Sequence, residues 1–116
     1  MGGGASLGEF EQIVLLAVLR LEGDAYGASI LTEIAACTGR MPSPGALYTT
    51  LHRMEDKGYI TFRDGSATQE RGGRAKRFVL ITPLGRNSVA SAQSAYRALL
   101  EGLDLLPTPH AGGFDA

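Results

Sequence analysis

The sequence predicts a mainly helical α+β domain, in which a two-stranded β hairpin follows three helices and precedes a fourth. Three observations support this prediction. Residues 43–57 form a capped amphipathic pattern that stops at Gly58, residues 59–63 and 77–81 alternate like strands, and residues 83–106 repeat apolar side chains at heptad spacing. This order of elements is typical of a winged helix-turn-helix with an added C-terminal helix.

A chain of 116 residues with 44% apolar and 20% charged residues has the size and composition of one globular domain. We expect a flexible glycine-rich leader over 1–6, a winged-helix domain over 7–82, a C-terminal dimerisation helix over 83–106 and a flexible tail over 107–116. The longest apolar run is too short to span a bilayer, and no signal peptide is visible. The single cysteine, Cys37, fits the cytoplasm, where we expect the protein to work.

The net charge of −1 hides a strong asymmetry along the chain. Residues 40–86 carry nine basic and four acidic side chains, a net of +5, whereas the rest carries two basic and eight acidic side chains, a net of −6. Local charge decides where a polyanion binds, so the whole-chain charge does not exclude a nucleic-acid partner.

The first helix is expected over residues 7–21 and is apolar on more than one side. A helix of this kind needs more cover than one small core provides, so part of it is expected to pack against a second subunit. Asp24 is the expected N-cap of a second helix over 26–37, which ends near Gly39.

The third helix begins with Ser43 at the N-cap and Pro44 at the first helical position. Its core-facing stripe is predicted to contain Leu47, Leu51 and Met54. The opposite arc is small, hydroxylated and basic, with Ala46, Thr49, Thr50, Arg53 and Lys57. Small residues let a helix enter the major groove, where donors reach bases and phosphates. The alternative, a solvated face, usually carries more Glu and Lys.

The segment between the two strands is polar, glycine-containing and basic near its far end. Glycine allows close approach to a sugar–phosphate backbone, and the basic side chains supply charge. The residues predicted to contact DNA from this wing are Arg71, Gly73, Arg74 and Lys76. The alternative is an exposed hairpin loop, which needs no cluster of arginines, and Glu70 would weaken the attraction locally.

The last helix carries apolar side chains at alternating spacings of three and four, which is a heptad stripe. The stripe could pack on its own domain, but together with the apolar first helix it favours a homodimer. The interface residues predicted from both helices are Phe10, Leu15, Leu19, Val89, Ala92, Tyr96, Leu99 and Leu103.

These segments, taken together, resemble the PadR family of bacterial transcriptional regulators. The matching motifs are residues 7–11 (LGEFE), 25–27 (AYG), 45–48 (GALY), 51–55 (LHRME), 57–60 (KGYI), 72–74 (GGR) and 80–85 (LITPLG). The resemblance covers roughly residues 7–88. The length, with one helix after the hairpin, is similar to the short branch of that family. The resemblance implies a homodimer that binds a palindromic operator in double-stranded DNA, usually as a repressor released by a small molecule or another signal. A small apolar or aromatic effector is a candidate partner.

The resemblance also implies roles for individual residues. Tyr26, at the start of the second helix, and Tyr48, on the third, are expected near the DNA backbone, although each could also pack in the core. The residues expected to read or approach bases are Ser43, Ala46, Thr49, Thr50 and Arg53. This chain contains no tryptophan, which departs from members that hold flat aromatic drugs between tryptophans. Tyr96 and Phe10 are its nearest aromatic substitutes.

Other functions are less well supported. Cys37 has no basic neighbour in sequence to activate its thiol, and as a redox sensor it could pair only between subunits. His52 and His110 are too few and too far apart for a metal site, so we expect no metal ion or cofactor. Without an activated nucleophile, we also expect no enzymatic activity. The main alternative is a winged-helix protein-interaction module without sequence-specific DNA binding. The charge asymmetry and the outer face of the third helix favour DNA.

Overall fold

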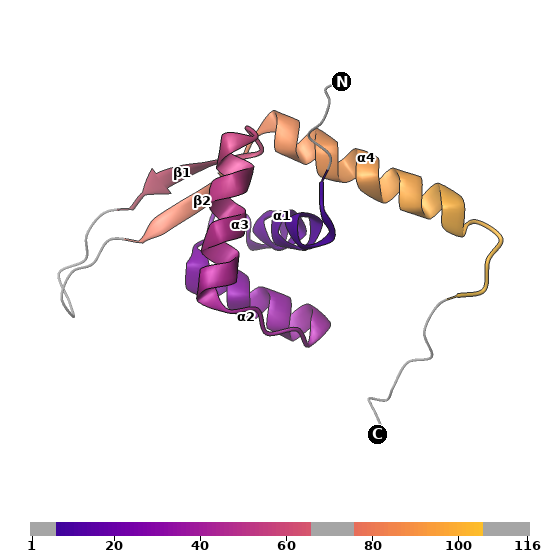
Figure 1. The fold of residues 1–116 in the computed structure, drawn as a ribbon, viewed down its shortest axis with the longest axis horizontal. Helices are drawn as coiled ribbons and strands as arrows, with labels where there is room; N and C mark the ends of the chain where they lie inside the picture. The colour runs from indigo at the N-terminus through magenta and orange to yellow at the C-terminus, as the bar shows by residue number, and fades with distance from the viewer. Residues whose placement is uncertain (1–6, 66–75, 106–116) are drawn as a thin grey trace.

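The computed structural model describes residues 7–65 and 76–105, and it confirms the predicted α+β winged-helix architecture (Figure 1). The elements follow the predicted order: α1 (Glu9–Leu21), α2 (Gly27–Thr38), α3 (Pro44–Asp56), β1 (Ile60–Asp64), β2 (Arg77–Ile81) and α4 (Pro83–Leu100). The predicted leader, the tip of the predicted wing and the predicted tail lie outside the described residues.

The two strands form an antiparallel hairpin in which Ile60 pairs with Ile81 and Asp64 with Arg77. The connection between α1 and α2 lies along the other edge of β2, because the Val79 N–H donates to the Ala25 carbonyl at 2.8 Å. The hairpin is therefore anchored to the helices by backbone as well as by packing, and Figure 1 shows it projecting from the helices beside α3.

Helix α1 lies at the centre of the domain, and α2, α3, β2 and α4 all pack against it. Val14 and Leu15 are completely buried by the chain's own elements. This corrects the prediction that Leu15 belongs to a dimer interface. The broad apolar surface of α1 reflects its central position, since a helix enclosed on several sides needs apolar residues on several sides.

The predicted Ser43 cap of α3 is present, and Thr82 caps α4 in the same way. The Ser43 hydroxyl accepts from the Ala46 N–H at 3.0 Å, and the Thr82 hydroxyl accepts from the Gly85 N–H at 3.0 Å. The prediction for Asp24 is wrong, because Tyr26 is the N-cap of α2. Ser29 takes over the local hydrogen bonding instead, with its hydroxyl accepting from the Tyr26 N–H and donating to the Asp24 carbonyl.

Helix α4 is shorter than predicted and ends at Leu100. Gly102 follows in a left-handed conformation with φ of 81°, and glycine is a poor residue for continuing a helix. Leu103 therefore lies beyond the helix. Val89 is 2% exposed and packs into the core, which corrects its predicted place in a dimer interface.

Gly85 lies where the first turn of α4 touches the connection between α3 and β1, and a side chain there would collide with the Tyr59 carbonyl. We expect Gly85→Ala to lower the free energy of unfolding by about 1–3 kcal/mol, because the backbone must shift to admit a methyl group. Gly45→Ala, in the first turn of α3, is the matched control because no atom lies within 4 Å of the added methyl group. Urea denaturation measures both. Equal losses in the two variants would contradict the close packing at Gly85.

Candidate nucleic-acid interface

The outer face of α3 is exposed, as the sequence predicts, but it is narrower than predicted. Thr50 is only 5% exposed, which corrects its predicted place on the outer face. It lies three residues after Leu47 and four before Met54, and both spacings bring a residue to the buried side of a helix. The predicted residues that are exposed are Ser43, Ala46, Tyr48, Thr49 and Arg53.

Lys57 is turned toward α1 and not outward. Its Nζ lies 3.0 and 3.2 Å from the two carboxylate oxygens of Glu11, whose side chain is 4% exposed. Arg53 lies one turn earlier, with Nη1 3.8 Å from Glu11 Oε2, and its side chain is 52% exposed. The predicted outer position of Lys57 is thus corrected. Its ammonium group binds Glu11 on the inner side of α3, while Arg53 stays at the surface.

Glu11 was not among the predicted site residues. A signal was available, because a glutamate three residues after a helix N-cap commonly accepts from the N-cap backbone, and Glu11 Oε1 does accept from the Gly8 N–H at 2.9 Å. Burial raises the pKa of this carboxyl group, but the Gly8 N–H, Lys57 and Arg53 outweigh burial and lower the pKa below its ordinary value. Glu11 is therefore a buried carboxylate held between the start of α1 and the end of α3.

The two predicted backbone-contacting tyrosines flank the start of α2. A Cβ atom on Gly27 would stand 2.5 Å from the Tyr48 hydroxyl, so only glycine lets α3 bring Tyr48 this close. The Tyr26 ring packs edge-on against Phe78 of β2, with ring centroids 5.7 Å apart. Lys76 Nζ lies 4.4 Å from the centroid of the Tyr26 ring. The start of α2, the middle of α3 and the base of the hairpin are thus brought together.

Cation–π contacts hold further basic side chains at the base of the hairpin. The Arg63 guanidinium lies 4.8 Å from the Phe78 ring, and the Arg77 guanidinium lies 4.2 Å from the Phe62 ring. The His52 ring of α3 lies 5.6 Å from the same Phe62 ring and joins the hairpin to the helix. Of the predicted wing residues, Lys76 is described and exposed. Arg71, Gly73 and Arg74 lie outside the described residues.

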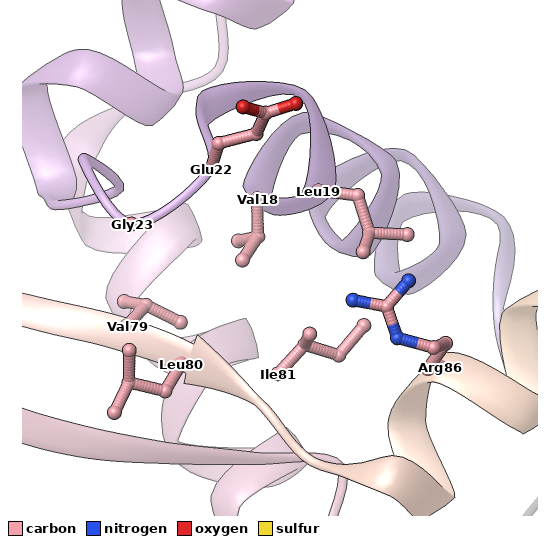
Figure 2. A pocket seen from close by; sticks show the side chains of 8 residues that line it. All are labelled: Val18, Leu19, Glu22, Gly23, Val79, Leu80, Ile81 and Arg86. Atoms are coloured by element: carbon pink, nitrogen blue, oxygen red, sulfur yellow. The ribbon is translucent and has the colours of Figure 1, made fainter.

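A pocket of about 200 Å³ lies between the end of α1, strand β2 and the first turns of α4 (Figure 2). Figure 2 shows apolar side chains facing the space, among them Val18, Leu19 and Ile81, with Glu22 and Arg86 at separate places on its rim. Its volume is smaller than that of a typical drug-binding site, and its lining is mainly apolar.

The remaining predicted interface residues differ in exposure. Phe10, Leu19 and Ala92 are half-buried, whereas Tyr96, Leu99 and Leu103 are 52%, 75% and 57% exposed. Across residues 7–65 and 76–105 there is no group of three or more metal-ligating side chains. None of the helices in this part of the chain is long and apolar enough to cross a membrane.

The fold defines a winged-helix protein in which α3 and the hairpin present an exposed, partly basic surface. The chain belongs to the PadR-like family of transcriptional regulators, whose family model matches residues 15–91. This is a family of regulators and not of enzymes. Transcriptional regulator Rv3488 of Mycobacterium tuberculosis is 33% identical to the chain over 78 residues, which cover 67% of this chain and 68% of that protein.

Solved structures show the same fold. A transcriptional regulator from Clostridium thermocellum superposes with a TM-score of 0.64 at 24% identity, covering 78% of this chain and 85% of its own. A PadR-like transcriptional regulator from Bacillus cereus superposes with a TM-score of 0.66 at 18% identity, covering 79% of this chain and 84% of its own.

The ionised Glu11 predicts an acid-sensitive contribution to stability. Because folding lowers its pKa, the stabilisation is complete above the ordinary value of 4.5 and is lost as pH falls through the lowered folded value. Glu11→Gln should cost about 1.5–3 kcal/mol near neutral pH, since hydrogen bonds to a charged group are lost. Urea denaturation from neutral pH to about pH 3 measures the difference from wild type, which should shrink on acidification. A difference that is independent of pH would contradict the buried carboxylate.

Proposed function

We propose that the protein is a homodimeric, sequence-specific transcriptional regulator that represses from a palindromic operator. Helix α3 enters the major groove, and the hairpin follows the flanking phosphate backbone. One observation carries this proposal: the exposed face of α3 presents Ala46, Thr49 and Arg53 directly beside a hairpin base that bears exposed basic side chains. A groove-binding helix needs small residues for close approach and donors for base edges.

The competing function is a protein-interaction module, and the chemistry of this face argues against it. Protein interfaces centre on buried aromatic and aliphatic anchors. The only large apolar side chain on the exposed face of α3 in the described structure is Tyr48, which is 39% exposed and rests against Gly27. The basic surroundings of the face instead suit a polyanion.

The residue roles within the proposal follow from position. Arg53, Thr49, Ala46 and Ser43 approach the bases from α3. Tyr26, Tyr48 and Lys76, gathered around the start of α2, approach the backbone. Thr50 and Lys57 support the helix from its inner side. Arg71, Gly73 and Arg74 remain proposed phosphate contacts of the wing, outside the described residues.

The dimer is supported by α4, whose C-terminal half extends away from the other elements in Figure 1. Tyr96 and Leu99 are exposed there although both are large and apolar, and such surfaces are usually covered by a partner. We propose that a second copy covers them and places the two α3 helices in successive major grooves. A small apolar or aromatic effector is part of the proposal, supported by the apolar pocket in Figure 2. The proposed site of action is the cytoplasm.

Selection of bound sequences from a random duplex DNA pool tests this function. We expect recovery of a palindrome whose half-sites lie about 10 bp apart, one half-site for each α3 of a dimer. Affinity for the recovered sequence should fall about a thousandfold or more between about 50 and 200 mM salt, because several phosphates are neutralised. A folded dimer that enriches no sequence at low salt would contradict operator binding and favour the interaction module.

A further inference from the structure

The most deeply buried charge in the described structure lies directly behind the proposed recognition surface. The Glu11 carboxylate is 4% exposed, comes from the first turn of α1, and faces two cations, Arg53 of α3 and Lys57 at the C-cap of α3. The proposed function uses Arg53 and does not need Glu11. An ionised group this deep in a domain is costly unless it is well paired. A role for Glu11 in DNA recognition would explain why a buried charge lies against α3.

The two cations contact Glu11 in different ways. Lys57 Nζ lies within hydrogen-bonding distance of both carboxylate oxygens, at 3.0 and 3.2 Å. Arg53 Nη1, at 3.8 Å from Oε2, is within ion-pair range but beyond hydrogen-bonding distance. Lys57 therefore donates hydrogen bonds to the buried carboxylate, while Arg53 is attracted to the carboxylate by charge without a hydrogen bond. The guanidinium keeps its hydrogen-bond donors for another partner.

We propose that Glu11 is a positioning residue for sequence recognition, which directs the Arg53 side chain toward base edges. This proposal rests on the proposed function and deepens it. A long arginine side chain loses much rotamer freedom when it docks in one geometry, and holding it beforehand reduces that loss. The carboxylate has a second effect, because its negative charge repels nearby phosphates and so disfavours binding to DNA of any sequence.

These two effects give Glu11→Gln a signature that a purely structural residue would not give. Loss of the negative charge leaves affinity for random DNA unchanged or raises it, while loss of positioning weakens discrimination between operator and random DNA. Unfolding would lower both affinities equally, so their ratio does not respond to it. The ratio of operator affinity to random-DNA affinity is therefore the quantity to measure.

The experiment is a double-mutant cycle on the full chain, with an operator obtained by selection and a random duplex of equal length. We expect Arg53→Ala to lower the affinity ratio roughly tenfold, as loss of one base contact does. Glu11→Gln should lower it roughly three- to tenfold, and adding Glu11→Gln to Arg53→Ala should change it no further, because the two residues act as a unit.

Glu9→Gln is the matched control for charge. Glu9 lies two residues away in the same turn, its side chain is 77% exposed, and it contacts Arg40 at 3.4 Å instead of α3. The same charge change there should leave the affinity ratio at its wild-type value.

Three results would overturn the proposal. Glu11→Gln could leave the affinity ratio unchanged, or it could lower the ratio equally with and without Arg53, or Arg53→Ala could itself leave the ratio unchanged. In all three cases the regulator function stands as long as the wild-type protein prefers its operator. Failure of the proposed function is a separate observation, namely a wild-type protein without any preferred sequence.

Discussion

The fold depends on the burial of α1. Its apolar side chains contact helices on several sides and strand β2, and Val14 and Leu15 are completely enclosed. Because α2, α3, β2 and α4 all pack against this one helix, their relative positions are set by how each fits it. The exposed face of α3 and the exposed half of α4 are the surfaces that remain once this packing is satisfied.

Two adjacent buried polar residues add direction to this packing. Glu11 binds Lys57 at the C-cap of α3, while Gln12 accepts from the Gln93 side-chain amide of α4 at 3.0 Å. Neighbouring residues on a helix point about 100° apart, so one turn of α1 can hold two different helices. Polar contacts of this kind specify geometry more sharply than apolar packing does, since a buried polar group left without its partner is costly. The first turn of α1 thus relates the proposed DNA-binding face to the proposed dimer helix.

Much of this architecture is predictable from local sequence chemistry. Ser43 followed by Pro44 marks the start of α3, and Thr82 followed by Pro83 marks that of α4. Tertiary context decides the rest. The apolar breadth of α1 is compatible with a dimer interface or with a central place in the monomer, and for Leu15 the central place accounts for it. The burial of Thr50 was predictable from its helical spacing to Leu47 and Met54, although its hydroxyl group suggested the outer face. The contact between Glu11 and Lys57 joins residues that are distant in sequence. Neither composition nor local spacing predicts which distant side chains meet in the fold.

We propose that the start of α2, the exposed face of α3 and the hairpin form a single DNA-binding surface. The most direct test is an amide NMR titration of the protein with its selected operator. If this surface binds the operator, we expect the largest shift changes around Tyr26, along residues 46–53 and at the hairpin, with little change over the far half of α4. Changes concentrated on α4 and absent from α3 would contradict it.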